Sequence, residues 1–238
     1  MLSARVPLPI THVAPVEHLE TADVVRRRRR VVAGVWVLGT GLLGLSLSTR
    51  PDSRAFYAMT ATVAATWSTG GVVSGPLHLG WIQGRDRHLR RPVVTPVATG
   101  VGTFGLFYAC ALVARRVPAL DRAIGNVLQF AEEGQGRLVV ATTLVNGLGE
   151  EIFFRGAMYA ALPPDRAVVA STAAYTLTTA STRNPALLLA AGVMGTLFGW
   201  QRRASGGLLA PVLTHLTWST LMVRYLPPLF RRTRDGRA

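Results

Sequence analysis

The chain has 238 residues, of which 49% are hydrophobic and 16% charged, and its mean hydropathy is +0.31. A water-soluble domain carries about 25% charged residues, so this composition argues against an ordinary soluble enzyme. The length suits a single membrane domain, because each spanning helix takes roughly 20 apolar residues. Little room remains for a second, soluble domain.

All 26 basic residues are arginines, and the chain has 12 acidic residues. The net charge is therefore +14 and the pI about 11.6. Such a balance favours contact with nucleic acid or with an anionic membrane surface. The arginines lie between apolar runs, without interleaved aromatic residues, so we expect no nucleic-acid partner. The single cysteine, Cys110, excludes an intramolecular disulfide and a cysteine-based metal site.

Residues 1–30 are predicted to form a basic cytoplasmic tail, which ends in five consecutive arginines directly before the apolar run 31–48. Charges in this position favour an uncleaved signal anchor over a cleaved signal peptide. The stretch 119–135 mixes charged and apolar residues and predicts an amphipathic helix at the membrane interface. Further apolar runs occupy residues 55–75, 93–114, 138–162, 167–181, 186–200 and 207–226.

These runs predict an all-α fold, since a spanning segment must satisfy its own backbone. We expect a polytopic membrane helix bundle of about six to eight transmembrane helices over residues 31–230, with a protease-like core at 138–226 and a basic tail at 231–238. The exact number of spans stays open. Arginines at 26–30, 85–91 and 202–203 would share one side, but seven spans would place the C-terminal arginines on the other, against the positive-inside rule.

The pattern GxGxxG occurs at residues 39–44 and 100–105. A dinucleotide site requires a strand before this pattern, a helix after it and an acidic residue about 20 positions later. Neither occurrence has this setting. The glycines, like the pair Gly195 and Gly199, instead predict helices that pack closely in a membrane.

The run 138–162 contains three charged residues that carry the candidate chemistry: Glu150, Glu151 and Arg155. Ionised groups deep in a bilayer are costly unless paired or hydrated, so they are functional candidates. Glu151 and Arg155 form an i, i+4 pair whose charges can cancel. Glu150 points about 100° away on the helix and is free to bind a metal or to act as a general base. The alternative is an ion pair that only fixes helix packing, with Glu150 satisfied by water.

The last apolar run places His215 one turn after Pro211 and puts Ser219 four residues further on the same face. A proline frees a backbone carbonyl and can open room for water. A lone histidine in an apolar helix is more often a packing residue than a ligand. Together with a glutamate on another helix, however, it can build a zinc-type hydrolytic centre. Glu150 and His215 are therefore the candidate metal ligands, although the HExxH arrangement of soluble enzymes is absent.

The motif EEIFFRG at residues 150–156, followed by an apolar helix and a last helix with a histidine, resembles the CPBP intramembrane proteases. This family is also called the CAAX-protease and bacteriocin-processing family, and the Ras-converting prenyl endopeptidase is a relative. The resemblance implies an all-helical membrane fold with a polar cavity. By similarity, Glu150 activates the attacking water, and His215 and Ser219 stabilise the oxyanion. Glu151 and Arg155 match the other positions of the first motif.

The chain departs from the family pattern at two positions. The second family motif is an aromatic residue followed four positions later by histidine, and here these positions hold Tyr175 and Thr179. Ser219 stands where the family usually has asparagine. Threonine binds metals poorly, so a zinc-assisted mechanism and a metal-independent glutamate mechanism both stay open. Asn146 and Tyr175 are the residues nearest to the motif that could supply another polar contact to the cavity.

The residues and the resemblance together predict an intramembrane endopeptidase in a bacterial cell membrane, with several spans. Its partners would be the lipid bilayer and a membrane-associated protein or peptide substrate, and its cofactor would be zinc or another divalent metal if the mechanism uses one. The first alternative is a non-catalytic scaffold or regulator on the same fold, which Thr179 favours. A second alternative is a small proton-coupled transporter with Glu150 as the proton carrier.

Overall fold

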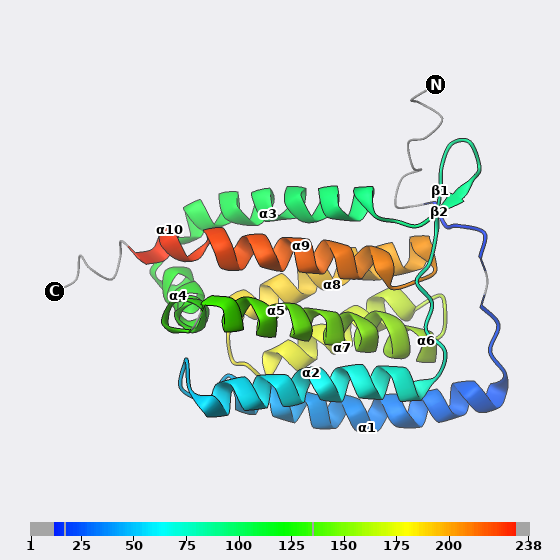
Figure 1. Cartoon of the computed structure of the whole chain (residues 1–238), viewed down its shortest axis with the longest axis horizontal. Helices are drawn as coiled ribbons and strands as arrows, with labels where there is room; N and C mark the ends of the chain where they lie inside the picture. Colours follow the sequence, from blue (N-terminus) through cyan, green and yellow to red (C-terminus); the bar gives the residue numbers. More distant parts are fainter. Residues whose placement is uncertain (1–11, 17, 135, 232–238) are drawn as a thin grey trace.

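The computed structural model describes residues 12–16, 18–134 and 136–231, and about three quarters of this part is helical. The prediction of an all-α fold is therefore confirmed. Seven long helical segments run along the molecule, and successive segments run in opposite directions (Figure 1). They are formed by α1 (Ala22–Ser46), α2 (Arg54–Ser74), α3 (Val94–Ala114), a continuous rod of α5 (Gly136–Glu150), η2 (Glu151–Met158) and α6 (Tyr159–Ala161), then α7 (Ala167–Ala180), α8 (Pro185–Ser205) and α9 (Leu209–Tyr225).

Three shorter elements close the two ends of the bundle. The helix α4 (Pro118–Glu133) lies across one end, where α10 (Pro227–Arg231) also ends (Figure 1). At the other end, β1 (Ile82–Gln83) and β2 (Leu89–Arg90) form an antiparallel hairpin. The amphipathic segment predicted at 119–135 is thus helical up to Glu133 and set crosswise to the others, as an interfacial helix would be; its last residue lies outside the described part of the chain.

The helices differ in whether their length and composition would allow each one to span a bilayer. In the described part of the chain, α3 is the one helix that is long and apolar enough to span, judged by length and composition. The first turns of α1 carry arginines. The 14 residues of α7 reach about 21 Å at 1.5 Å per residue, less than the roughly 30 Å of a hydrocarbon core. The rod of α5, η2 and α6 changes from an α-helix to a π-helix at Glu151.

The first helix begins earlier than the sequence predicts. We expected one tail over residues 1–30, but α1 starts at Ala22 and includes the arginines at 26–30. Arginine is a good helix former, and the charge of the fully buried Arg28 is balanced by an ion pair with Glu20. Five adjacent arginines can therefore occupy a helix instead of an extended tail.

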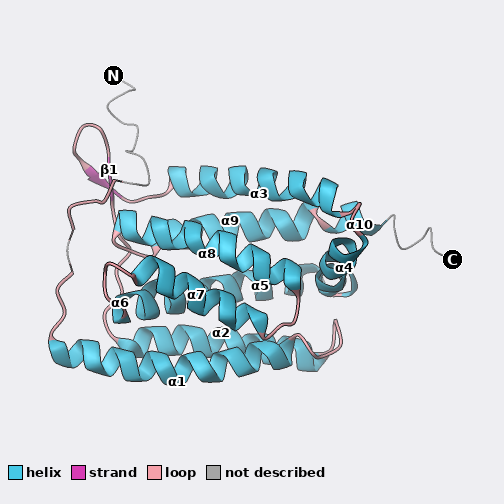
Figure 2. Ribbon diagram, turned by 180° about the vertical axis from the view of Figure 1, so that it is seen from behind, coloured by secondary structure: helices cyan, strands magenta, loops and turns pink. Residues whose placement is uncertain are grey.

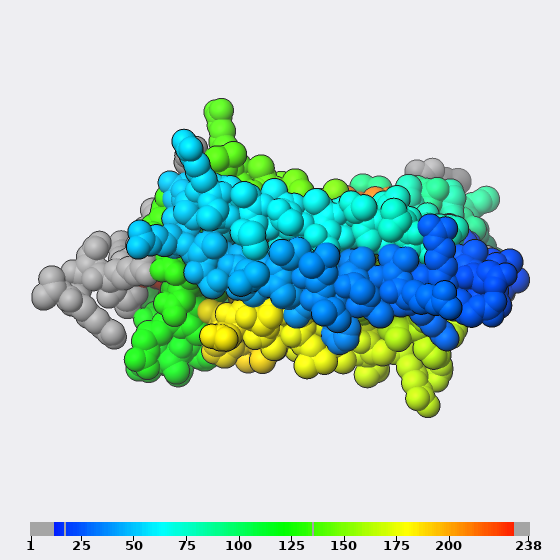
Figure 3. Space-filling model, turned by 90° about the horizontal axis from the view of Figure 1, so that it is seen from below, coloured from blue at the N-terminus to red at the C-terminus, as the bar shows by residue number. Residues whose placement is uncertain are grey.

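Glycines allow the closest helix contacts, as predicted for a bundle of this composition. Seen from below, α1 lies along the molecule between α2 and the yellow-green α7 (Figure 3). A Cβ atom added at Gly39 of α1 would lie 2.3 Å from the ring of Trp67 on α2. Gly195 and Gly199 likewise face Thr172 and Val168 across the α7–α8 contact. Some glycines of the predicted patterns therefore serve helix packing, whereas Gly41, Gly102 and Gly105 have open space beside them.

Replacing Gly39 by alanine is expected to destabilise the fold by about 1–3 kcal/mol, because the added methyl group overpacks against a fully buried tryptophan. Gly41 lies in the same helix with open space beside it. Gly41→Ala should be neutral or stabilising, since alanine is the better helix former. The free energy of unfolding in detergent micelles, measured for both variants, checks the pair. Equal values would contradict the packing role of Gly39.

An aromatic cluster next to α2 anchors the segment that carries the EEIFFRG motif. Phe153 and Phe154 of η2 are fully buried. The centroids of their rings lie 4.6 and 5.2 Å, respectively, from the ring centroid of Trp67. Phe154 also contacts the ring of Tyr175 on α7, at 5.0 Å. Burying aromatic side chains of this size contributes strongly to stability. The adjacent charged residues are therefore held on a rigid support.

A strap formed by the described part of residues 12–21 closes the hairpin end of the bundle. The N–H of Ala14 donates to the carbonyl oxygen of Ala204 at 2.9 Å. The ring of His18 stacks on that of His78, with centroids 3.5 Å apart and planes inclined by 3°. The segment ahead of α1 is thus docked on the bundle.

The two stacked histidines favour their neutral forms. Burial lowers the pKa of His18 below the ordinary value of about 6.5, and the charges of His78 and Arg202 lower it further, against an opposing effect of Glu20. The pKa of His78 is lowered by burial and by Arg202 and Arg28, again opposed by Glu20. Protonation is therefore easier in the undocked strap than in the docked one.

Docking of the strap should consequently be strongest above about pH 6.5 and should weaken as the pH falls below that value. The amide of Ala14 reports this directly, because docking pairs it with Ala204. We expect its hydrogen exchange, corrected for the intrinsic rate, to be faster at pH 5.5 than at pH 7.5. In the variant His18→Phe, which keeps a stacked ring without a titrating group, the difference should shrink. Equal protection of the wild type at both pH values would contradict this prediction.

Candidate active site

The EEIFFRG motif lies where the α-helix α5 changes into the π-helical segment η2. Glu150 is the last residue of α5, and η2 begins at Glu151. A π-helical segment is rare and often marks a functional site. Seven of its eight residues are buried. The change of helical form thus falls between the two adjacent glutamates, which have different surroundings.

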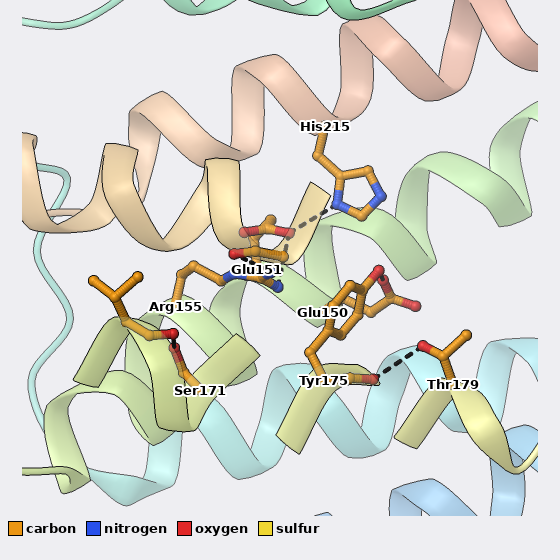
Figure 4. Close-up of polar contacts among 9 residues, drawn as sticks. Glu150, Glu151, Arg155, Ser171, Tyr175, Thr179 and His215 are labelled. Carbon is orange, nitrogen blue, oxygen red and sulfur yellow. Dashed lines mark hydrogen bonds and ion pairs between the residues drawn. The ribbon is translucent and has the colours of Figure 1, made fainter. Parts of the chain in front are cut away.

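Glu151 is the centre of a buried ionic cluster (Figure 4). Its Oε1 accepts a hydrogen bond from Nη1 of Arg155 at 3.3 Å and contacts Nδ1 of His215 at 2.8 Å. Glu151 and Arg155 are fully buried, and His215 is 5% exposed. The predicted i, i+4 pair is therefore present. A carboxylate only accepts hydrogen bonds, so the proton of this contact lies on Nδ1 when Glu151 is ionised.

The aromatic and backbone groups around Arg155 compensate its buried charge. Nη2 donates to the carbonyl oxygen of Gly195 at 3.3 Å. The guanidinium carbon lies 4.5 Å from the ring centroid of Tyr175 and 5.0 Å from that of Phe198. The ring of Phe198 also stacks on His215, with centroids 4.8 Å apart. These contacts fix the arginine and the histidine relative to η2.

Glu150 stands apart from this cluster. It is half-buried, and its Oε2 accepts a hydrogen bond of 2.7 Å from the hydroxyl of Tyr175 on α7 (Figure 4). Tyr175 is the aromatic residue of the second motif, and its hydroxyl is the polar contact that the sequence offered as a substitute for the missing histidine. Glu150 thus has a partner that leaves its charge uncancelled.

The other candidate side chains lie outside the ionic cluster. The hydroxyl of Thr179 donates to the carbonyl oxygen of Tyr175 at 3.0 Å, within its own helix. Ser219 is buried on α9, one turn after His215. Nδ2 of Asn146 donates to the carbonyl oxygens of Thr60 and Thr142 at 3.3 and 3.0 Å. These residues border the site without joining the ionic cluster.

The donor set does not make up a zinc site. Within the described residues, no group of three histidine, cysteine, aspartate or glutamate side chains is placed to hold a metal ion. Catalytic zinc normally takes three protein ligands. Of the two ligands expected from sequence, His215 already directs Nδ1 at Glu151 rather than at Glu150. The steps proposed below therefore use only protein groups and water.

The structure adds contacts that the sequence did not predict. His215 pairs with the second glutamate, not the first, and these residues are separated by 64 positions in the chain. The ring of Phe198 against the histidine was also missed, and its place in a run of small and apolar residues gives no signal for it. Tyr175 could be found because it occupies a motif position.

The helical bundle thus brings two glutamates, an arginine and a histidine together from separate helices. Residues 134–221 match the family model described as Rce1-like, Type II CAAX prenyl endopeptidase Rce1-like. This match covers less than half of the chain, and over that segment it confirms the resemblance that the motifs indicated. No curated protein and no solved structure matches the chain.

Proposed function

We propose that the protein is a multi-pass intramembrane endopeptidase that cleaves a membrane-associated protein or peptide with water activated by Glu150. The family match supports a hydrolase of the CAAX-protease type. The observation that carries the mechanism is the division between the two glutamates. Glu151 is neutralised by Arg155 and bound to His215, whereas Glu150 is half-buried and has only a phenol as partner.

In this mechanism, Glu150 removes a proton from a water molecule, and the hydroxide oxygen bonds to the carbonyl carbon of the substrate. The π electrons of the carbonyl move to its oxygen, giving a tetrahedral oxyanion. His215, protonated and held through Nδ1 by Glu151, donates Nε2–H to that oxyanion, with the hydroxyl of Ser219 as a second donor. Glu150 then returns its proton to the amine nitrogen as the peptide bond breaks. The second proton of the water stays on the attacking oxygen, so the products are a carboxylic acid and an amine, which become a carboxylate and an ammonium when that proton passes to the amine.

Arginines lie at both ends of the bundle. Those of early α1, of the β1–β2 hairpin and of the end of α8 lie at the hairpin end (Figure 1). A similar set lies at the α4 end, at positions 50, 54, 115, 116, 122, 137, 183 and 224. The positive-inside rule therefore favours neither end as the cytoplasmic one.

The direct test compares protein termini in membranes from cells that express the wild type or Glu150→Gln at matched levels. We expect new termini that are present only with the wild type, and these would name the substrate. The scaffold alternative has specific support, because Thr179 bonds within its own helix and supplies no group to Glu150. Identical termini in both membranes across growth conditions would favour that alternative.

Tyr175 is proposed to position Glu150. Tyr175→Phe removes one hydrogen bond to a carboxylate and keeps the ring contacts with Arg155 and Phe154. Hydrogen bonds to charged groups are worth about 1.5–3 kcal/mol, so kcat should fall about tenfold or more with KM nearly unchanged. Tyr108→Phe, on α3 away from both glutamates, is the matched control and should keep its kcat. A rise in KM alone would contradict a positioning role.

A further inference from the structure

A separate pocket of about 620 Å³ opens at the hairpin end of the bundle, between the strap, α1, the loop before the hairpin, the η2–α6 segment and the end of α8. It does not contain the glutamates or the histidine of the candidate active site. Its wall combines apolar residues with two arginines, Arg29 and Arg202, and with the stacked pair His18 and His78. The apolar part consists of Val16, Val25, Leu77, Leu162, Leu208 and several prolines.

The two arginines of the pocket are oriented by their Nε groups. Nε of Arg29 donates to the carbonyl oxygen of Ala161 at 2.9 Å, and Nε of Arg202 donates to that of Arg155 at 2.8 Å. Neither guanidinium has an ion pair with any carboxylate of the described residues. Each side chain is thus anchored at one nitrogen while its two terminal nitrogens keep their donor capacity.

The acidic residue of the pocket wall does not offset this charge. Glu20 is paired with the fully buried Arg28 through both of its carboxylate oxygens. Arg28 also donates to Ser74 and to the carbonyl oxygen of Pro76. With Glu20 neutralised in this way, Arg29 and Arg202 leave a net positive charge in the pocket. Arginine pairs are well suited to bind phosphate, because the planar guanidinium presents parallel N–H donors.

We propose that this pocket binds a phosphate group, held by Arg29 and Arg202, with the apolar wall contacting the carbon skeleton that carries it. The phosphate could come from the headgroup of an anionic phospholipid or from a soluble phosphate ester. The position at one end of the bundle suits a lipid headgroup at the membrane surface. The pocket touches the proposed catalytic element directly, since Gly156 and Tyr159 lie in its wall and Arg202 bonds to the backbone of Arg155.

The test measures binding to the full-length protein, delipidated in a neutral detergent, by calorimetry. The probes are inorganic phosphate, glycerol 3-phosphate and short-chain phosphatidylglycerol, and short-chain phosphatidylcholine is the zwitterionic comparison. We expect saturable binding of at least one anionic probe. Preference for phosphatidylglycerol over all others would identify a lipid headgroup as the source, whereas equal or tighter binding of glycerol 3-phosphate would identify a soluble ester. Absence of binding by every anionic probe would overturn the proposal.

Matched variants separate this site from a general effect of positive charge. The double variant Arg29→Gln and Arg202→Gln should bind at least tenfold more weakly. The control double variant removes Arg27 and Arg203, which are exposed neighbours in the same helices and do not line the pocket, and it should bind like the wild type. Equal weakening in both double variants would overturn the proposal.

A third variant keeps the test decisive if loss of the arginines harms folding. Ala160 lines the pocket and is half-buried, so Ala160→Phe fills the space without removing a charge. We expect it to weaken binding at least tenfold while its elution volume and unfolding midpoint match those of the wild type. Unchanged affinity in this folded variant would overturn the assignment of the pocket. Because the readout is binding, it stays independent of whether the protein cleaves peptides.

Discussion

Replacing Glu150 by glutamine is expected to lower the rate of peptide-bond hydrolysis by about 10²-fold to 10⁴-fold, the range that a general base typically contributes. The amide keeps the shape of the side chain and can still accept the hydrogen bond from Tyr175, but it cannot take a proton from water. The loss should therefore appear in kcat, with the fold intact. The measurement is the turnover of a peptide substrate by purified protein, using the cleavage site found from the new termini.

Two controls make the result specific to Glu150. Glu133→Gln removes a carboxylate from an exposed position of α4 and should leave kcat unchanged. Glu150→Asp keeps the charge but withdraws it from Tyr175, so its activity should lie between those of the wild type and the glutamine variant. A glutamine variant with wild-type kcat would remove Glu150 from the mechanism and favour the scaffold alternative.

Local patterns predicted much of the fold. The apolar runs located each long helix, because burial in an apolar phase requires long runs of apolar residues. The contact between Glu151 and Arg155 also followed from sequence, since i, i+4 spacing places two side chains together wherever a helix forms. The different partners of Glu150 and Glu151 followed from the same geometry. These predictions succeeded because their causes lie within a few residues.

Contacts between distant segments could not be predicted in the same way. The sequence placed a glutamate and His215 on different helices, but the choice between Glu150 and Glu151 depends on how α9 packs against η2. The π-helical form of η2 shifts side chains away from the α-helical positions that spacing assumes. The strap was missed because its contacts through Ala14 and His18 join it to parts of the chain far along the sequence.

The proposed phosphate pocket and the candidate active site both use the rod of α5, η2 and α6. We nevertheless expect mutations to affect phosphate binding and hydrolysis differently. Arg202 bonds to the backbone of Arg155, which links the pocket wall to the ionic cluster. A ligand in the pocket would therefore stabilise the segment that carries the cluster. Loss of Glu150 should leave phosphate binding unchanged, because this residue does not line the pocket. Hydrolysis and phosphate binding should therefore both be measured in the Glu150 variant. Loss of hydrolysis with normal phosphate binding would show that the chemistry is lost while the helical rod is intact.

Replacing Arg155 by methionine is expected to be the most destabilising single change, costing about 3–5 kcal/mol, because it leaves Glu151 buried without its cation. Methionine fills a similar volume, so the effect arises mainly from charge. The bond to Gly195 is lost as well. Titration with a denaturing detergent, followed by far-ultraviolet circular dichroism, measures the free energy of unfolding. Arg203→Met, at an exposed position, should change it by less than about 0.5 kcal/mol.

The double variant Glu151→Gln and Arg155→Met distinguishes a buried charge from lost packing. Glutamine removes the unpaired charge and still offers an oxygen to Nδ1 of His215. We expect the double variant to be more stable than Arg155→Met alone, with a coupling energy above about 1 kcal/mol. It should fold and yet hydrolyse peptides slowly, because a neutral glutamine no longer stabilises a protonated His215. If the losses of unfolding free energy in Glu151→Gln and Arg155→Met simply add in the double variant, the ionic cluster does not hold η2 and α9 together.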